Sequence, residues 1–371
     1  MPDLPEKPLN REPPIQDLTS TFLTPPDSAY DRNHGVLAHL NANTHRVRVD
    51  GAVNQTLSLS LSDLHSFPQT NVTCALQCAG NRRHTMRTKI REVQGLNWHD
   101  GAIMNSQWSG PRLRDILAKA GGIALSASEQ ATAHVAFACH TAPCEAETWY
   151  GASIPLSRAL REDGEVLLAT SMNGAPLPPN HGFPVRVVAP GIAGARAVKW
   201  VDRITVQRGE SENVYMQRDY KVLPPEVRDS QQAEGYWGVT PPVQEMPVNS
   251  AISFPVEGGV AERGEDGCVG VVGYAVPSGD DGPVTRVEVS ADEGQSWTEA
   301  ELLRGPEEGE EGKWAWKLWR ARVCVPEGWG KTTVYSRATD QAGNTQPERS
   351  QWNLRGVCYN GYGEAADVMI K

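Results

Sequence analysis

The sequence predicts an α+β protein of two domains, in which a mixed α/β domain precedes an antiparallel β-sandwich. The chain of 371 residues is longer than one hydrophobic core usually grows. Strand-like and helical patterns alternate from about residue 45 to residue 235, and short β-like segments with Gly, Asp and Pro turns follow. A proline-rich passage at 239–249 separates these two kinds of sequence pattern. We therefore expect an arm at 1–28, a first domain at 29–238 and a second at 239–371.

The arm is rich in proline and in charged residues. Such a composition rarely buries enough apolar surface to offset the entropy of ordering the chain. We expect the arm to be extended or disordered and to take no part in the core.

The first domain combines both types of pattern. Strands are expected at 45–49, 134–138, 183–189 and 198–206, and helices at 111–120 and 154–160. This alternation is typical of a mixed α+β domain.

The second domain contains β-like segments at 267–276, 284–297, 313–325 and 332–344. Their spacing is typical of an antiparallel sandwich. Within 313–318, strand alternation would place Trp314, Trp316 and Leu318 on one face and Lys313, Ala315 and Lys317 on the other. Six of the eleven tryptophans follow residue 290, which favours a sandwich core over a dimer face as their location.

Charge and terminal signals restrict the partners and the compartment. A net charge of −10 predicts no general attraction to nucleic acid or to an anionic membrane, so any anion chemistry must come from local arginines. No apolar run reaches the roughly 18 residues of a membrane span. The N-terminus resembles neither a signal peptide nor a transit peptide, and the C-terminus is not Ser-Lys-Leu. A cytoplasmic location is expected, with the peroxisome and the mitochondrial intermembrane space as alternatives.

The seven cysteines are odd in number and never form a C-x-x-C pair. They lie at positions 74, 78, 139, 144, 268, 324 and 358. This pattern argues against a zinc ribbon or a redox dithiol and favours a reducing compartment.

Cys78 stands out because small residues and two arginines follow it in CALQCAGNRR at 74–83. Small residues permit close approach of a ligand, and nearby arginines favour the thiolate over the thiol. Residue chemistry leaves three interpretations open: a buried structural cysteine, a nucleophile with His84 or another histidine as its base, and the single thiolate ligand of a metal held by a cofactor. Cys74 is assigned to the core.

Eight motifs narrow these alternatives. They are RNHG at 32–35, LQCAGNRR at 76–83, GLNW at 95–98, YGASIPL at 150–156, MNGAPLPPNHGFPVRVV at 172–188, GARAVKW at 194–200, QRDYK at 217–221 and WNLRGV at 352–357. In order and approximate spacing this set closely resembles the sulfite oxidase family of molybdenum enzymes, in the plant-type form that lacks a haem domain. The resemblance runs from about residue 30 to residue 357 and favours the metal-ligand interpretation of Cys78.

The resemblance implies a molybdenum–molybdopterin cofactor, with one molybdenum per chain and Cys78 as its one protein ligand. The anion pocket would be formed by Arg32, Arg83, Trp98, Tyr220 and Arg355. The pterin and its phosphate would be held by Asn33, His34, His181, Arg186, Ala197, Val198 and Lys199. Guanidinium groups suit a small tetrahedral dianion because each offers paired donors in a fixed plane.

The implied activity is oxidation of sulfite to sulfate by oxygen-atom transfer. The resemblance implies O2 as the electron acceptor, with H2O2 as the product, and an external cytochrome c as the alternative acceptor. No haem is expected, because only about 28 residues precede the matched region. Family members are usually homodimers through a C-terminal immunoglobulin-like domain, so a homodimer is expected.

Alternative functions remain open at this point. Nitrate reductases resemble the sequence too, but they typically carry methionine at the position of Arg355, which therefore favours sulfite. A cofactor-free binding or assembly protein would not need Cys78, Arg83 and Arg355 intact. A cysteine hydrolase would need a base aligned with Cys78 and no metal.

Three features depart from the family pattern. Asn180 stands where many relatives have Asp, and Thr141 stands where the family often has an aspartate that contacts the pterin. A pterin contact at Thr141 is therefore not carried over. The tail at 358–371 lacks the Trp-His-Arg pattern usual in the last strand, so that strand and its dimer contact are not carried over either.

Overall fold

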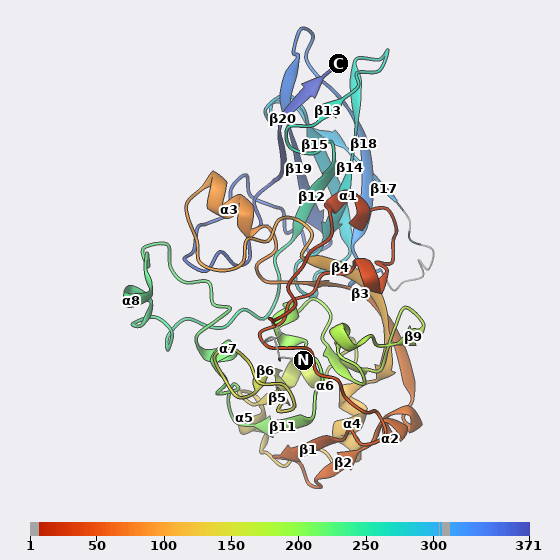
Figure 1. Ribbon diagram of the computed structural model, residues 1–371, viewed down its shortest axis with the longest axis vertical. Helices are drawn as coiled ribbons and strands as arrows, with labels where there is room; N and C mark the ends of the chain where they lie inside the picture. The colour runs from red at the N-terminus through yellow and green to blue at the C-terminus, as the bar shows by residue number, and fades with distance from the viewer. Residues whose placement is uncertain (1–6, 304, 306–311) are drawn as a thin grey trace, which may run out of the picture.

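The computed structural model of the protein describes residues 7–303, 305 and 312–371. Figure 1 shows a β-sandwich at one end of the long axis and a mixed sheet at the other end, with a second sheet between them. The predicted order of a mixed α/β domain followed by a β-rich domain is confirmed. The exact domain boundaries and the immunoglobulin-like character of the sandwich stay predictions.

A five-stranded sheet with the order β2-β1-β11-β5-β6 lies at the end opposite the sandwich (Figure 1). Its strands are β1 (Val47–Gly51), β2 (Leu57–Leu59), β5 (His134–Cys139), β6 (Tyr150–Pro155) and β11 (Arg203–Gln207). β1 and β11 are parallel, and the other neighbours are antiparallel. Helices α4 (Leu113–Lys119) and α6 (Leu156–Leu160) pack their apolar faces against this sheet and complete its core. The predicted helices at 111–120 and 154–160 correspond to these two elements.

Two of the predicted strands are shorter than expected. The run 198–206 becomes a strand only from Arg203, because Trp200 has a φ of +54°, which extended backbone does not allow. The run 183–189 contributes only β10 (Arg186–Val188), which pairs with β7 (Leu167–Ala169).

The second sheet brings Cys78 to its position. It contains β3 (Gln69–Gln77), β4 (Ile103–Pro111), β8 (Ser171–Met172) and β9 (Ala175–Pro176), in that order. Val72, Cys74 and Leu76 alternate along β3 and are buried around Trp108, so the assignment of Cys74 to the core is confirmed. β3 ends one residue before Cys78, and a tight turn then leads into α3 (Arg83–Lys89).

The sandwich consists of two antiparallel-rich sheets. One contains β12 (Asn249–Phe254), β14 (Cys268–Val276), β18 (Lys317–Cys324) and β17 (Glu301–Leu303), and the other contains β13 (Val260–Ala261), β20 (Gly363–Ile370), β19 (Lys331–Asp340), β15 (Val284–Ser290) and β16 (Thr298–Glu299). Valine and alanine side chains from both sheets form their common core with Trp319. The tail does form a last strand, β20, although it lacks the family pattern.

The tryptophans near residue 315 are buried, but not by the expected alternation. β18 begins at Lys317, so Trp314 and Trp316 precede the strand, and Ala315 between them is buried as well. Trp314 packs in the core around β3, and Trp316 packs between the two domains. The face assignment was wrong because this segment is irregular rather than extended.

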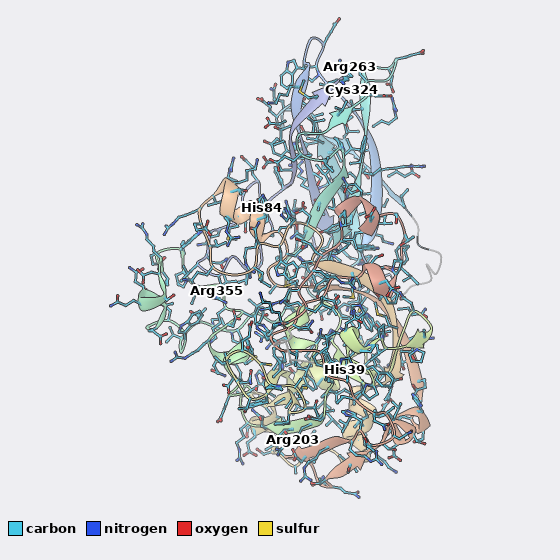
Figure 2. The ribbon with its side chains drawn as sticks, viewed as in Figure 1. His39, His84, Arg203, Arg263, Cys324 and Arg355 are labelled. Atoms are coloured by element: carbon cyan, nitrogen blue, oxygen red, sulfur yellow. A yellow bond between two sulfur atoms is a disulfide. The ribbon has the colours of Figure 1, made fainter. Side chains whose placement is uncertain are left out.

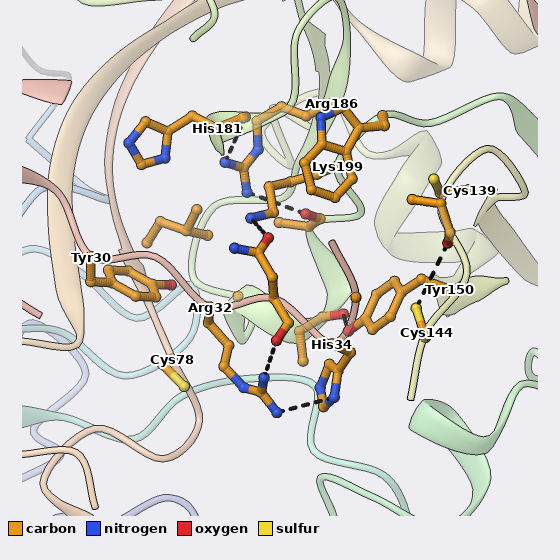
Figure 3. A pocket seen from close by; sticks show the side chains of 18 of the residues that line it. Tyr30, Arg32, His34, Cys78, Cys139, Cys144, Tyr150, His181, Arg186 and Lys199 are labelled. Atoms are coloured by element: carbon orange, nitrogen blue, oxygen red, sulfur yellow. Dashed lines mark hydrogen bonds between the residues drawn. The ribbon is translucent and has the colours of Figure 1, made fainter. Parts of the chain in front are cut away.

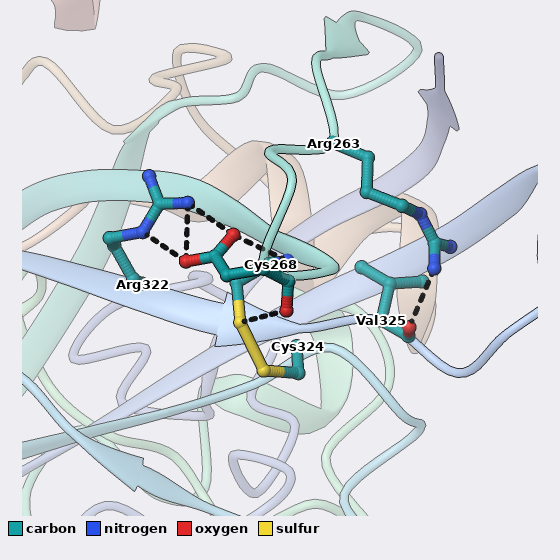
Figure 4. The surroundings of a disulfide bond; sticks show 6 residues. Arg263, Cys268, Arg322, Cys324 and Val325 are labelled. Atoms are coloured by element: carbon teal, nitrogen blue, oxygen red, sulfur yellow. Dashed lines mark hydrogen bonds and ion pairs between the residues drawn. A yellow bond between two sulfur atoms is a disulfide. The ribbon is translucent and has the colours of Figure 1, made fainter.

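Cys268 and Cys324 form a disulfide at the outer end of the sandwich (Figure 4). They lie directly opposite each other in the β14–β18 register, and the Arg322–Asp266 ion pair lies beside them. The other five cysteines are free. A disulfide was not expected, because the cysteine pattern favoured a reducing compartment. The two cysteines are 56 residues apart in the sequence, and only strand pairing brings them together.

The described part of the arm, residues 7–28, contributes to the core. It contains α1 (Ile15–Leu18) and a short 3-10 turn, η1 (Pro26–Ser28). Leu18 is buried with Ile103, Tyr274 and Trp316 between the two domains. Ile15 and Phe22 pack against the same cluster. The expectation that the arm takes no part in the core was therefore wrong, since a few apolar residues among the prolines anchor the segment.

The remaining short elements connect these layers. They are α2 (Leu61–Ser66), α5 (Ala127–Gln130), α7 (Val214–Gln217), α8 (Ser230–Ala233), η2 (Pro179–His181) and η3 (Gly194–Arg196). Among the described residues, no helix has the length and apolar character needed to cross a lipid bilayer.

Candidate active site

A cavity opens where β3 ends, between the segment that follows the arm and the loops around η2 and η3 (Figure 3). The empty space of the cavity and its mouth measures about 770 Å³, part of which is open to solvent. Nine of the predicted site residues line it: Arg32, Asn33, His34, Cys78, His181, Arg186, Ala197, Lys199 and Tyr220. Segments that are distant in sequence therefore converge as the motifs predicted.

Cys78 lies at the wall of this cavity, at the end of β3. Its backbone N–H donates to the carbonyl of Ala102 (2.9 Å), and its sulfur accepts the N–H of Gly80 (3.4 Å). Burial raises the pKa of the Cys78 thiol, although the charge of Arg83, the Gly80 N–H and the charge of Arg32 act to lower it. The expected preference for the thiolate is therefore wrong for the chain without a metal, because burial outweighs the arginines. A bound metal would deprotonate the thiol directly.

Arg32, His34 and Tyr220 form one hydrogen-bonded chain. Arg32 Nη2 lies 3.0 Å from His34 Nδ1, and His34 Nε2 lies 2.7 Å from the Tyr220 hydroxyl. A guanidinium group only donates, so Nδ1 must be the acceptor. Burial, helped by the charge of Arg32, holds the pKa of His34 well below its usual range, which keeps the ring neutral.

The neutral ring fixes the direction of the next hydrogen bond. With Nδ1 as acceptor, the proton of the His34 ring is on Nε2 and is donated to the oxygen of Tyr220. The hydroxyl proton of Tyr220 is then available to an acceptor in the cavity. Tyr220 has a φ of +51°, a strained conformation of the kind that concentrates at functional sites.

The opposite wall of the cavity carries an excess of positive charge. Arg186 donates to the carbonyls of His181 (3.1 Å) and Ala197 (3.2 Å), and Lys199 donates to the Asn33 side chain (Figure 3). Lys199 also donates to the Asn180 carbonyl. Burial, followed by the charge of Arg186, lowers the pKa of Lys199 to about 7. No carboxylate is among the described residues that line the cavity.

Arg83 does not line the cavity but lies next to it in a slot built from glycines. Its Nε donates to the carbonyls of Arg355 (3.0 Å) and Gly356 (3.2 Å), and Nη1 donates to the carbonyl of Leu96 (2.9 Å). A Cβ on Gly80 or Gly95 would come within 2.8 Å of its guanidinium group. Gly80 and Gly95 come from two different motifs, and both are explained by the packing of one buried arginine. The charge of Arg83 still acts on Cys78.

Arg355 and Trp98 also lie outside the cavity lining. Arg355 Nη2 donates to Asp219 Oδ1 (2.8 Å), and its Nη1 contacts Gln94 Oε1 (3.4 Å). Figure 2 places Arg355 on the side of the molecule that carries α3 and α8. The Trp98 side chain packs in the same core as Cys78, and its buried indole N–H has no hydrogen-bond partner among the described residues.

Val198 is a correction to the predicted site. Its side chain belongs to the core beneath the five-stranded sheet, and it does not line the cavity. Its N–H donates to the carbonyl of Arg196, and its carbonyl accepts the N–H of Val187. Its place inside a matched motif was misleading because its side chain packs in the core while its neighbours Ala197 and Lys199 line the cavity.

The structure shows the contacts of Thr141 and Asn180, two residues that depart from the family pattern. Thr141 is exposed and bonds to Cys139 Sγ (3.3 Å), so it does not line the cavity. Asn180 Nδ2 donates to Asp31 Oδ1 (3.0 Å), a buried carboxylate that also pairs with Arg11 (2.6 Å).

Sequence reasoning missed several residues of the site. Tyr30, Cys139, Cys144 and Trp200 line the cavity. Tyr150 does so as well, with its hydroxyl bonded to the carbonyl of Ala195 (2.7 Å). Tyr150 and Trp200 stood inside quoted motifs, which was the available signal, whereas nothing in the sequence marked the other three.

The residues present fit a large anionic cofactor. The buried Nε of Arg186 has no hydrogen-bond partner among the described residues. An anion would satisfy that donor and would restore the charged form of Lys199, which burial disfavours. Cys78, at the end of β3, would supply one thiolate to a metal whose other ligands come from the cofactor.

Comparisons with known proteins identify the family of the chain. The family model described as "Oxidoreductase molybdopterin binding domain" matches residues 34–215, and the model described as "Mo-co oxidoreductase dimerisation domain" matches residues 240–366. The chain is 45% identical over 361 residues to mitochondrial sulfite oxidase of Mus musculus, covering 96% of this chain and 63% of the mouse protein. It therefore spans less than two thirds of that relative.

Two further matches cover a larger share of the matched protein. Sulfite oxidase of Arabidopsis thaliana is 41% identical over 366 residues, which cover 95% of this chain and 90% of the plant protein. The crystal structure of the sulfane dehydrogenase SoxCD from Paracoccus pantotrophus superposes with a TM-score of 0.77 at 27% identity, covering 98% of this chain and 86% of that one.

Proposed function

Because the chain belongs to the sulfite oxidase family of molybdopterin oxidoreductases, we propose that it oxidises sulfite to sulfate in the cavity around Cys78. One observation carries the proposal. Arg32, Arg186 and Lys199 place positive charge in the cavity that Cys78 lines, and no carboxylate is among its described lining residues. Such a site favours a dianionic substrate and an anionic cofactor together.

The cofactor would be held at two ends. Cys78 would bind molybdenum through its thiolate, and Asn33, His34, His181, Arg186, Ala197 and Lys199 would hold the pterin and its phosphate. When bound, molybdenum supplies the oxygen-atom transfer and takes up two electrons.

The chain's own residues would bind and orient the anion. Arg32 would offer its charge to the sulfite oxygens, and Tyr220 would donate its hydroxyl proton to one of them, because His34 supplies a proton to the Tyr220 oxygen and leaves that hydroxyl free to donate. Tyr220 stays protonated throughout, since burial raises its pKa.

Arg83, Trp98 and Arg355 lie outside the cavity lining and would support the residues that line it. Arg83 contributes charge near Cys78 while its donors hold the loop at 355–356. The indole N–H of Trp98 and the Nε of Arg355 have no partner among the described residues, so they would be two further donors for an anion that approaches them. Asp219 holds Arg355 in place next to Tyr220.

The partners follow from the same proposal. The chain carries a dimerisation domain, and we propose a homodimer formed through it. We propose O2 as the electron acceptor and H2O2 as the product, with an external cytochrome c as the alternative. Sulfite-dependent oxygen uptake by the purified protein, without added cytochrome, distinguishes the two acceptors.

Elemental analysis and turnover test the proposal together. The purified protein should contain about one molybdenum per chain and should produce sulfate from sulfite. Cys78→Ser should abolish sulfate production, whereas Cys74→Ser, which alters a core cysteine outside the cavity, should leave some turnover per bound molybdenum. A metal-free protein with full activity, or an active Cys78→Ser variant, contradicts the proposal.

A further inference from the structure

The N-terminal arm reaches the candidate anion site through Asn10. The Asn10 Oδ1 atom accepts two hydrogen bonds, one from Arg32 Nη1 (3.1 Å) and one from the backbone N–H of Asn33 (3.0 Å). The carbonyl of Leu9 accepts a third from Asn33 Nδ2 (2.7 Å). Two consecutive arm residues thus hold the two residues that begin the RNHG motif.

The arm itself is fixed on both sides of Asn10. Arg11 forms a two-way backbone bridge with Asp31 (3.0 and 2.9 Å), and its Nε bonds to the buried Asp31 carboxylate (2.6 Å). The Glu12 carboxylate accepts the backbone N–H groups of His99 (2.8 Å) and Gly101 (3.1 Å). Residues 9–12 therefore connect the Arg32 segment to the loop that follows Trp98, and Asn10 is not a loosely placed surface residue.

Arg32 depends on such contacts for its orientation. A free arginine side chain has many rotamers, and fixing one of them costs conformational entropy. In this structure Nη2 is held by His34, and Nη1 is held by Asn10 and by the carbonyl of Asn33. Asn10 contributes the only side-chain oxygen among these described contacts.

We propose that Asn10 is a positioning residue for substrate binding, which acts by orienting Arg32 toward the anion. The inference rests on the proposed function, because it takes Arg32 as an anion-binding group. It adds a residue of the arm, outside both matched domain models, to the determinants of sulfite affinity.

Steady-state kinetics of the molybdenum-loaded protein test the inference first. Asn10→Ala should raise the KM for sulfite about tenfold, the effect of losing one hydrogen bond to a charged group, with kcat changed less than about twofold. Molybdenum content should not change. Gln16→Ala, which removes an exposed amide from the same arm, should leave both constants unchanged. An unchanged KM in Asn10→Ala overturns the inference.

A double-mutant cycle separates positioning from a general structural effect. If Asn10 acts through Arg32, then Asn10→Ala should have no further effect on the KM when Arg32 is already alanine. Additive effects of the two substitutions would show that Asn10 acts by another route and would overturn the proposal.

Hydrogen exchange provides a readout that does not depend on turnover. The backbone N–H of Asn33 bonds to Asn10 Oδ1, so Asn10→Ala should accelerate its exchange, whereas Gln16→Ala should not. Asn10→Asp keeps an acceptor oxygen, so it should keep this protection while its negative charge beside Arg32 raises the KM. Unchanged exchange in Asn10→Ala contradicts the proposed hold on residues 32–33. If the native protein does not oxidise sulfite, the proposed function fails, and the exchange experiment still decides whether Asn10 orders this segment.

Discussion

Arg83 shows how one side chain can account for several sequence motifs. The methylene and guanidinium groups of Arg83 fill a slot bordered by Gly80, Gly95 and Gly356, which come from three separate motifs. Because a side chain at any of these positions would overlap Arg83, the glycines are required for packing and not only for flexibility.

We expect Gly80→Ala to displace Arg83. The added Cβ would lie 2.6 Å from its guanidinium carbon, so either the arginine or the turn must move. The free energy of unfolding should fall by about 1–3 kcal/mol, and sulfite kcat/KM should fall with it. Denaturant titration and steady-state kinetics measure the two effects. Gly209→Ala, whose added methyl group meets nothing within 4 Å, is the control, and equal behaviour of the two variants would contradict the slot.

Arg355 is the residue that distinguishes the two related activities in the sequence. Its guanidinium group is held by Asp219 and has a buried Nε without a partner among the described residues. Arg355→Met should lower kcat/KM for sulfite by more than about tenfold, because it removes a charged donor and leaves Asp219 without its cation. Arg228→Met, at an exposed arginine, should not change it. An unchanged kcat/KM in Arg355→Met would exclude Arg355 from the site.

Lys199 makes the stability of the cofactor-free protein depend on pH. Its pKa of about 7 in the folded state lies below its ordinary value, so between about pH 7 and pH 10 the unfolded chain binds more protons than the folded one. Stability therefore rises with pH in this window, and the destabilising effect is complete below about pH 7.

We expect Lys199→Met to raise the Tm of the cofactor-free protein more at pH 6.5 than at pH 9.5. The same variant should retain less molybdenum, because it lacks a cation that would hold the cofactor. Thermal melts at both pH values and elemental analysis measure these effects, with the exposed Lys119→Met as the control. An equal Tm change at both pH values would show that Lys199 is not destabilised by burial.

At the scale of the elements, the turn between β3 and α3 has a double function. Arg82 and Arg83 are adjacent, yet Arg83 turns toward the site and Arg82 turns toward the sandwich. Arg82 has a φ of +64°, and its guanidinium group is buried. Its Nη1 donates to Asn249 Oδ1 (2.7 Å) and to the carbonyl of Gly361 (2.7 Å). One turn therefore joins the cysteine loop to the second domain.

We expect Arg82→Lys to destabilise the whole chain. Lysine cannot reproduce the planar set of donors, so buried carbonyls of the sandwich would lose their partners, at a cost of about 3 kcal/mol or more. The change should appear as a lower denaturation midpoint, with Arg228→Lys as a surface control. A midpoint equal to that of the native protein would show that the two domains do not depend on this contact.

At the scale of the whole molecule, the arm and the sandwich both contact the first domain. The arm runs from the cavity, where Asn10 lies, to the core between the domains, where Leu18 is buried. The sandwich is tied to the cysteine loop through Arg82. Truncating either part would therefore disturb the site without touching a residue that lines it.

We expect the protein to be a dimer in solution, with a mass twice the 40.4 kDa of the chain. The match to a dimerisation domain at 240–366 is the basis of this prediction. Light scattering coupled to size-exclusion chromatography measures the mass directly. A mass of 40.4 kDa that persists at micromolar concentration would contradict the dimer.

The compartment stays a prediction at this scale. The sequence favours the cytoplasm, whereas the Cys268–Cys324 disulfide is more typical of an oxidising environment.

Much of the fold and the site could be predicted from local sequence. Apolar alternation predicted β1 and β5, helical spacing predicted α4 and α6, and turn-rich β segments predicted the sandwich. The resemblance of the motifs to the sulfite oxidase family indicated most of the cavity lining. Local patterns suffice for these features because they depend on neighbours in the chain.

Only the tertiary structure decided the features that depend on contacts between distant segments. These are the burial that raises the pKa of Cys78, the Cys268–Cys324 pair, the core position of Val198 and the contact between Asn10 and Arg32. Desolvation and hydrogen-bond geometry are set by which segments pack together, and no local pattern records that. The sequence by itself therefore determined which chemical groups the protein has for anion and metal binding, and the packing decided which of them face the cavity and in which protonation state.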